Sequence, residues 1–207
     1  MRHLPLVLAL AACGSPTSNA PPLADAAADG DAAGGDAATV RPSGQAAWSD
    51  GCAMNACSPA AHSLRGAQGS PNVDVDCALR AVTGGYSVFF RIAAIATAGQ
   101  SFDESREGLY VRGFLPAVGQ QLRSQSAEDV GNVRVRGNGW EVRVAALGPS
   151  SPCHVTITTL SDGGFAGTIA CEGMRDDATP PNTRYLRGGT AALNPSLGEF
   201  VMGGCSP

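Results

Sequence analysis

The 207-residue sequence has no lysine and only three histidines. All 14 basic residues are therefore arginine, and 18 Asp and Glu residues give the chain a formal net charge of −4. Without an excess of positive charge, the chain is not expected to bind nucleic acid. The largely apolar run at residues 4–12 has nine residues. At 1.5 Å per residue it cannot cross a hydrocarbon layer roughly 30 Å thick, so it is not a membrane-spanning helix.

Motifs of common enzymes are also missing from the sequence. It has no Gly-x-Ser-x-Gly elbow, no His-Glu-x-x-His motif and no glycine-rich phosphate loop ahead of a helix. We interpret His62 as a loop or short-helix residue and His154 as a solvent-facing strand residue. Asp103, Glu104 and Glu107 could supply the acid and base of a glycosidase, but a polar turn is the more common reason for such a cluster. We therefore expect no enzyme activity and no cofactor.

The start of the chain carries its most specific pattern. Arg2 and His3 precede the apolar run, which ends in Leu10-Ala11-Ala12-Cys13 before Gly14. This pattern resembles the lipobox of bacterial lipoproteins. The resemblance implies that residues 1–12 are a signal peptide, that Cys13 becomes the acylated N-terminus, and that two or three acyl chains anchor it stably. Gly14, in place of an Asp, implies the outer membrane. An ordinary secretory signal is the alternative, and a leader shorter than about 15–30 residues leaves open a start codon further upstream.

Residues 13–45 and 46–207 differ in composition. The first segment is rich in Ala, Asp, Gly and Pro and has no aromatic residue, so it predicts a disordered linker. Four acidic residues keep it extended: Asp25, Asp29, Asp31 and Asp36. All 11 aromatic residues lie between 48 and 200, and residues 46–207 are long enough for a single domain with its own core.

The first of three predicted hairpins spans 73–81 and 86–94. Apolar and polar residues alternate in both segments, which is the period of a half-buried strand. A two-residue turn at Gly84-Gly85 would place Leu79 opposite Phe90 and Cys77 opposite Ile92. Both apolar sets would then share one face.

The second predicted hairpin turns at Asn138-Gly139, the strongest short hairpin signal. A two-residue loop pairs Val135 with Val142 and Val133 with Val144. On the other face Arg136 lies opposite Glu141. The same register places Arg134 opposite Arg143, an unfavourable pair of like charges.

The third predicted hairpin contains Ser161-Asp162-Gly163. A two-residue loop would put its two apolar sets on opposite faces, whereas a three-residue loop with Gly163 left-handed puts them together. The three-residue loop pairs Ile157 with Gly167 and Cys153 with Cys171, within reach of a disulfide.

Other parts of the domain are less sharply patterned. Strands are expected at 108–115 and 199–204, and a weak helical pattern covers 117–123. Residues 116–128 and 172–188 are interpreted as long connections. Short strands at this spacing predict an all-β fold, an antiparallel β-sandwich or small barrel built from hairpins and cross-linked by disulfides.

The cysteines are seven in number, so setting Cys13 aside leaves six. An even number in an oxidising compartment favours three disulfides. With Cys153–Cys171 fixed by the third hairpin, three pairings of the rest stay open. We favour Cys77 with Cys205, which joins an early strand to the last one and leaves Cys52 with Cys57.

Two spacings suggest metal sites as alternatives. Asp29-Gly30-Asp31 begins like a calcium loop but lacks the later acidic ligand and the flanking helices. Cys52-x4-Cys57-x4-His62 is not a usual zinc spacing, and thiolates outside the cytoplasm tend to oxidise. We interpret the first as linker and the second as a disulfide, and we expect no metal.

The domain also resembles small secreted lipoprotein antigens and other uncharacterised bacterial lipoproteins. The shared features are the lipobox, the polar tether, Val75-Asp76-Cys77 and the terminal Gly198-Glu199-Phe200-Val201-Met202-Gly203-Gly204-Cys205. The resemblance implies the Cys77–Cys205 link and an extracytoplasmic β-fold. It brings no catalytic residues.

One polar surface suggests a partner. Arg134, Arg136 and Arg143 share the outer face of the second hairpin, where Glu141 alone offsets them. This face could bind an anionic partner such as lipid headgroups or an acidic glycan, or it could be a solvated face balanced by acids from a neighbouring strand. The sequence thus predicts a monomeric, membrane-anchored β-module in the cell envelope, in the periplasm or at the cell surface, that binds or displays an unknown partner. The alternatives are a purely structural surface protein and a hydrolase with unrecognised residues.

Overall fold

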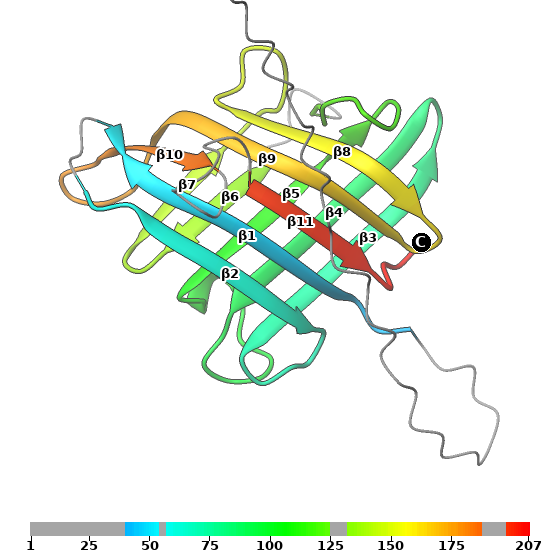
Figure 1. The fold of residues 1–207 in the computed structure, drawn as a ribbon, viewed down its shortest axis with the longest axis horizontal. Coiled ribbons are helices and arrows are strands. Elements are labelled where there is room, and N and C mark those ends of the chain that lie inside the picture. Colours follow the sequence, from blue (N-terminus) through cyan, green and yellow to red (C-terminus); the bar gives the residue numbers. More distant parts are fainter. Residues whose placement is uncertain (1–39, 54–56, 125–131, 188–197) are drawn as a thin grey trace, which may run out of the picture. The chain divides into compact units, whose positions relative to one another are not determined.

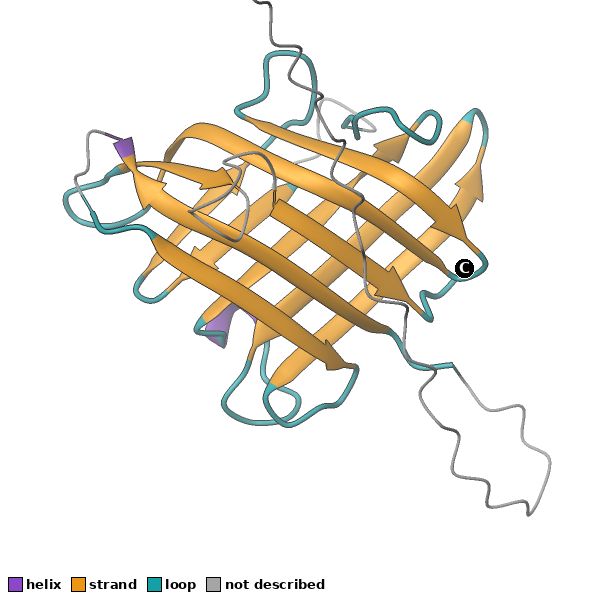
Figure 2. Cartoon of the chain, viewed as in Figure 1, coloured by secondary structure: helices purple, strands orange, loops and turns teal. Residues whose placement is uncertain are grey.

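The computed structural model describes residues 40–53, 57–124, 132–187 and 198–207. The leader at 1–12, Cys13 and the linker up to residue 39 lie outside these ranges. The described residues form 11 strands and a short 3-10 turn, η2 (Phe102–Glu104) (Figure 2). The strands are β1 (Ser43–Cys52), β2 (Ala60–Ala67), β3 (Val73–Val82), β4 (Gly85–Ala94), β5 (Glu107–Leu115), β6 (Val133–Gly137), β7 (Trp140–Val144), β8 (Cys153–Ser161), β9 (Gly164–Arg175), β10 (Thr183–Arg187) and β11 (Gly198–Gly203). The all-β prediction is confirmed.

The strands form two antiparallel sheets that face each other across a common core (Figure 1). Sheet A has the order β10-β1-β11-β9-β8, with β2 on the outer side of β1. Sheet B is a meander of consecutive strands, β3-β4-β5-β6-β7. In Figure 1 the strands of sheet A run across those of sheet B behind them. Of the two architectures expected, the fold is therefore the sandwich.

Two short strands, β10 and β11, both lie between β1 and β9 in sheet A. β10 pairs with Ser49–Cys52 of β1, and β11 pairs with Ser43–Ala47 of the same strand. On their other side both strands pair with β9. Both therefore run antiparallel to β1, one after the other, and together they complete the sheet between β1 and β9.

Aromatic side chains fill the space between the sheets. Phe90 of sheet B lies with its ring centroid 4.4 Å from that of Phe200 and 6.0 Å from that of Phe165, both in sheet A. Trp48, Phe90 and Phe200 are all at most 1% exposed. Burial of such large apolar surfaces contributes about 25 cal/mol per Å², so this contact is a main source of the adhesion between the sheets.

The first hairpin confirms the shared apolar face but corrects the register. Val82 pairs with Gly85, so the turn is Thr83-Gly84, and Gly84 has a φ of +82°. Cys77 consequently lies opposite Phe90, and Leu79 lies opposite Val88. The predicted register was wrong by two residues, because a shift of two keeps every side chain on its face and the alternation alone cannot detect it.

The second hairpin has the predicted register throughout. Val135 pairs with Val142, Arg136 with Glu141 and Arg134 with Arg143 around the Asn138-Gly139 turn. Gly139 has a φ of +80°, as a turn of this type requires. Pattern and turn chemistry agreed here, which left one register.

The third hairpin keeps the predicted pairs with a different loop. Cys153 lies opposite Cys171 and Ile157 opposite Gly167, and Gly163 has a φ of +67°. Ser161 pairs with Gly164, however, so the loop has two residues, and the pairing shifts by one between Ile157 and Thr159. The extra residue sits in a β-bulge within β8, which restores the shared apolar face.

Several elements were missed by the sequence patterns. β1 begins at Ser43, inside the range assigned to the linker, and β2 and β10 were not predicted. β9 extends to Arg175, and β10 occupies part of the range interpreted as a long connection. The segment 117–123 is not helical, because Gln121 bridges to Thr156 and Arg123 bridges to Phe114. The strand expected at 199–204 is β11.

Three disulfides cross-link the domain with the favoured pairing. They join Cys52 to Cys57, Cys77 to Cys205 and Cys153 to Cys171. Cys77 lies on β3 of sheet B and Cys205 directly follows β11 of sheet A, so this bond ties the two sheets together across 128 residues of chain. Cys153–Cys171 joins two neighbouring strands within sheet A.

Candidate functional site

The most unusual group in the domain is a histidine that lies at the end of the core. His62 on β2 pairs with Trp48 on β1, so both side chains point to the inner face of sheet A. Their rings stack with centroids 5.0 Å apart and an angle of 17° between the planes. The His62 side chain is only 9% exposed. The sequence-based assignment of His62 to a loop or short helix was therefore wrong.

Both ring nitrogens of His62 contact carboxylates. Nε2 lies 2.6 Å from Oδ2 of Asp50, and Nδ1 lies 2.5 Å from Oε2 of Glu107. Because a carboxylate only accepts hydrogen bonds, each nitrogen must donate a proton, which is the state of a charged imidazolium. Burial by itself lowers the pKa of His62, but the hydrogen bonds to Asp50 and Glu107 outweigh it and raise the pKa above its ordinary value.

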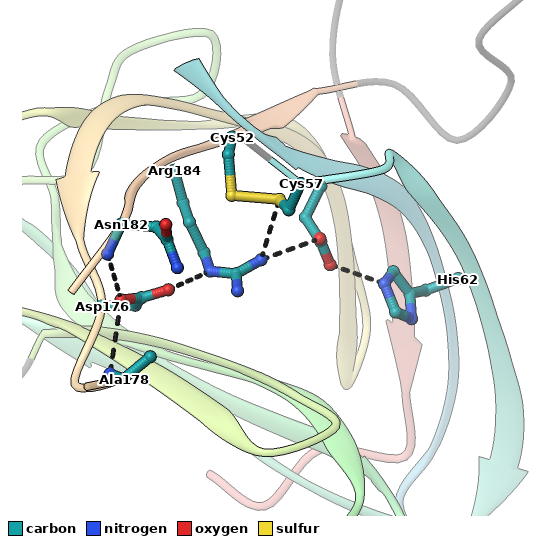
Figure 3. Close-up of a disulfide and its surroundings, with 8 residues drawn as sticks. Cys52, Cys57, His62, Asp176, Ala178, Asn182 and Arg184 are labelled. Carbon is teal, nitrogen blue, oxygen red and sulfur yellow. Dashed lines mark hydrogen bonds and ion pairs between the residues drawn. A yellow bond between two sulfur atoms is a disulfide. The ribbon is translucent and has the colours of Figure 1, made fainter. Parts of the chain in front are cut away.

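Asp50 in turn contacts an arginine. Arg184 on β10 places one terminal nitrogen 3.6 Å from Oδ1 of Asp50, and its Nε donates to Asp176. The guanidinium carbon lies 3.9 Å from the centre of the Trp140 ring on β7, a close cation–π contact. Figure 3 shows Arg184 between the two carboxylates, beside the Cys52–Cys57 disulfide.

Asp176 is the last charged residue of this series, and its side chain is fully buried. Its side chain is 0% exposed, and its oxygens accept hydrogen bonds from the backbone N–H groups of Asn182 and Ala178 (Figure 3). Burial raises the pKa of Asp176, but these hydrogen bonds and Arg184 together lower it below its ordinary value. Asp176 is therefore ionised at neutral pH.

We call the set Glu107, His62, Asp50, Arg184 and Asp176 the charged chain. Glu107 belongs to sheet B and the other members come from β1, β2 and the β9–β10 region of sheet A. Neither ring nitrogen of His62 is open to a substrate, because each is held by a carboxylate of the protein. This arrangement suits a structural tie between the sheets better than general base catalysis, which needs a nitrogen that can reach a substrate proton.

A second charged cluster occupies the outer face of the β6–β7 hairpin. Glu141 is 3% exposed, and one of its oxygens lies 2.8 Å from Nε of Arg134 and 2.7 Å from Nε of Arg143. Arg136 approaches the other oxygen at 3.5 Å. Burial raises the pKa of Glu141, but the hydrogen bonds from Arg134 and Arg143 outweigh it and the pKa is lowered. Glu141 thus relieves the repulsion expected between the opposed Arg134 and Arg143.

The three arginines share a face as predicted and all contact Glu141, but two of them have further partners in η2. Arg134 also pairs with Asp103 of η2, and Arg136 donates to the backbone carbonyl oxygens of Phe102 and Asp103. Arg134 additionally lies over the Phe102 ring, with its guanidinium carbon 4.9 Å from the centroid. Arg143 is the exception, since its side chain is 66% exposed. The predicted anion-binding face therefore reduces to Arg143.

The carboxylates considered for a glycosidase point to different partners. Asp103 pairs with Arg134, and that hydrogen bond lowers the pKa of Asp103. Glu104 accepts hydrogen bonds from the backbone N–H and hydroxyl of Ser101 in a capping box. Glu107 contacts His62. Each carboxylate is thus paired with a different group of the protein. His154 is an exposed strand residue, as predicted, near Gln121.

The alternative of a metal site at Cys52-x4-Cys57-x4-His62 does not fit the cysteines of the structure. Cys52 and Cys57 form a disulfide, so their sulfurs are not thiolate ligands. Within the described residues no three His, Cys, Asp or Glu side chains converge in a way that could hold a metal ion. His62 directs its two nitrogens to two separate carboxylates, which leaves neither nitrogen for a metal.

The charged chain was missed because its members are far apart in sequence. One local signal existed: Ala46, Trp48, Asp50 and Cys52 alternate with period two, which places Asp50 beside Trp48 on one strand face. Nothing near His62 in the sequence indicates Glu107 or Arg184. The Glu107 contact arises only when sheet B packs on sheet A, and the Arg184 contact with Asp50 arises only when β10 pairs with β1 within sheet A.

Comparison with known proteins gives no match for this chain. No protein-family model matches it, and neither a curated protein nor a solved structure shows significant similarity. In the part of the chain that the structure describes, no helix is long and apolar enough to cross a membrane. Its function must therefore be argued from its own residues.

Proposed function

We propose that the chain is a lipid-anchored extracytoplasmic protein, attached to the outer membrane through Cys13, whose β-domain binds or presents a partner in the cell envelope without catalysing a reaction. The observation that carries the proposal is the cysteine inventory. Six of the seven cysteines form three disulfides within the domain, and the seventh is Cys13 of the lipobox sequence. Disulfides persist in oxidising compartments, which agrees with export.

The state of the ionisable groups supports a non-enzymatic role. His62 is enclosed and held at both nitrogens, and Glu107 is its partner. The other histidine of the domain, His154, lies exposed on β8, where its recorded contact is with Gln121. A binding or display role needs a stable scaffold, and the two charged clusters together with three disulfides provide one.

Metabolic labelling tests the anchor. Cells that express the full chain receive a clickable palmitate analogue, and the labelled protein is followed by gel fluorescence and membrane fractionation. Wild type is expected to carry label and to sediment with the outer membrane. Cys13→Ser should lose the label and leave the outer-membrane fraction, whereas the matched variant Ser15→Ala should keep both properties. Label on Cys13→Ser, or its absence from wild type, contradicts the proposal.

The distribution of the lipoprotein between the inner and outer membranes tests the outer-membrane assignment. If Gly14 directs the lipoprotein outward, Gly14→Asp should carry the same label but move to the inner-membrane fraction, and Gly14→Ser should not move. Equal distribution of Gly14→Asp and wild type contradicts the outer-membrane assignment while leaving lipid attachment intact.

A further inference from the structure

A surface pocket lies between the open edge of β7 and the end of β9. Its volume is about 460 Å³, and it is lined by residues 142–144 of β7, the connection at 145–152 and residues 173–175 of β9. Pockets of roughly 300–1,000 Å³ hold small organic ligands. The pocket is separate from the charged chain and shares one residue, Arg143, with the outer face of the β6–β7 hairpin.

Two arginines, Arg143 and Arg175, are among the residues that line this pocket. Arg143 uses its Nε to contact Glu141 at 2.7 Å, and its side chain is nevertheless 66% exposed. Its two terminal nitrogens therefore extend outward from a fixed anchor point. Arg175, at the end of β9, is exposed, and none of the ion pairs recorded for the described residues includes it. The two arginines come from different sheets, Arg143 from β7 of sheet B and Arg175 from β9 of sheet A.

Neutral donors complete the lining. Ser150 and Ser151 belong to the connection, and the Ser151 hydroxyl oxygen accepts a hydrogen bond from the Cys153 N–H at 3.1 Å, which leaves its proton free to donate. The backbone of Glu141 bonds outward to Asp177. Because alternate residues of a strand direct their N–H groups to the same edge, the N–H of Arg143 also points to the open edge of β7.

The lining has a single sign of charge. Among the described residues that form the pocket, none is Asp or Glu. Two other surface pockets differ in this respect, since Asp162 contributes to both of them. Two carboxylates lie outside this lining but near β7: Glu141, which is 3% exposed and shared among Arg134, Arg136 and Arg143, and the exposed Asp177, whose Oδ1 accepts a hydrogen bond from the Glu141 N–H. The lining that would surround an anion thus includes two arginines and two serines but no carboxylate, and Asp177 outside it already accepts the Glu141 N–H.

We propose that this pocket binds a phosphate group, with Arg143 and Arg175 as the charged ligands and Ser150, Ser151 and the Arg143 N–H as neutral donors. Guanidinium groups form paired, charge-assisted hydrogen bonds with phosphate oxygens. The donors come from three chain segments of the lining, and a phosphate group offers at least three acceptor oxygens where a carboxylate offers two. Phosphate binding at this pocket does not require acylation of Cys13. The phosphate-site proposal can therefore be tested independently of the lipid-anchor proposal.

Calorimetric titration tests the chemistry. The full chain with Cys13→Ser, which removes any acyl anchor, is titrated at low ionic strength with inorganic phosphate, glycerol phosphate and succinate. Both phosphate probes are expected to bind more tightly than the dicarboxylate. Arg143→Gln and Arg175→Gln should each weaken phosphate binding about tenfold, which corresponds to about 1.4 kcal/mol. Arg65→Gln, which removes an exposed arginine from β2, is the matched control and should bind as wild type does.

A vesicle flotation experiment distinguishes a lipid headgroup from a soluble phosphate ester as the ligand. The same Cys13→Ser protein is floated with phosphatidylcholine vesicles that contain or lack phosphatidylglycerol. Arginine-dependent flotation with the anionic vesicles identifies a lipid headgroup as the ligand, and titration by glycerol phosphate without flotation identifies a soluble phosphate ester. Arg175→Gln leaves the Glu141 cluster untouched, so a loss of binding there cannot come from its collapse. Binding that is unchanged in both variants, equal for succinate and phosphate, or equally reduced in Arg65→Gln overturns the proposal.

Discussion

Nε2 of His62 lies 2.6 Å from Oδ2 of Asp50 on the neighbouring strand, while Nδ1 of the same ring contacts Glu107 in the opposite sheet. A neutral imidazole has one donor nitrogen and cannot satisfy both carboxylates. The protonated ring therefore ties sheet A to sheet B by charge as well as by stacking on Trp48. The tie exists only while His62 holds its second proton.

Stability is expected to decline with rising pH because of this tie. The pKa of His62 is raised in the folded protein, whereas in the unfolded chain it is near 6.5. The contribution is complete below about 6.5, where His62 is charged in both states, and it is lost as pH rises through the folded pKa. Urea unfolding at a series of pH values should show the free energy of unfolding falling above about pH 6.5.

His62→Gln provides the check. It should lower the free energy of unfolding by about 1–3 kcal/mol at pH 6 and abolish most of the decline above that pH. His154→Gln removes an exposed histidine and should retain the wild-type profile. If wild type and His62→Gln show the same dependence on alkaline pH, the imidazolium tie is wrong.

Arg184 is expected to be far more important to stability than its neighbour Arg187. Arg184→Met leaves Asp176, whose side chain is 0% exposed, without its cation, and loss of one partner of a buried pair costs about 3–5 kcal/mol. Arg187 pairs with Glu172, but those side chains are 41% and 59% exposed, so Arg187→Met should cost under about 1 kcal/mol. Chemical denaturation of both variants measures the difference, and equal losses would contradict a buried charged chain.

The disulfides are expected to differ in their contributions. A chain-entropy treatment gives about 5 kcal/mol for closing the 128-residue separation of Cys77 and Cys205, and about 3 kcal/mol for the 18-residue separation of Cys153 and Cys171. Paired Cys→Ala replacements compared by thermal and urea unfolding should follow that order. A larger loss from removal of Cys153–Cys171 would show that local packing, and not loop closure, dominates.

Gly167 on β9 is expected to tolerate no side chain. A Cβ there would overlap the carbonyl oxygen of Thr156 and lie 2.7 Å from the Phe200 ring. Gly167→Ala should therefore cost about 1–3 kcal/mol by forcing apart the sheet and the aromatic core. At Gly203 the nearest atom to a new Cβ is 3.7 Å away, so Gly203→Ala is the matched control with little effect. Equal stability of the two variants would mean that Phe200 can move aside.

Local patterns predicted the hairpins well and the assembly poorly. Asn138-Gly139 and the alternating valines set the β6–β7 register because turn chemistry and face agreed. At Gly84-Gly85 two turns satisfied the same alternation, and the register was wrong by two residues. β10 directly follows β9 along the chain, but its other partner, β1, is distant in sequence, so the local pattern did not indicate this strand. The charged chain escaped prediction for the same reason, since Glu107 and Arg184 meet His62 and Asp50 only in the packed sandwich.

The mass of the N-terminal peptide is the decisive measurement. The full chain is expressed in a bacterium with a lipoprotein pathway, recovered from the membrane under non-reducing conditions and digested for mass spectrometry. The proposal predicts a first residue of Cys13 that carries two or three acyl chains, together with the disulfide-linked peptides of the three domain pairs. An unmodified Cys13 thiol, or cleavage at another residue, would contradict it.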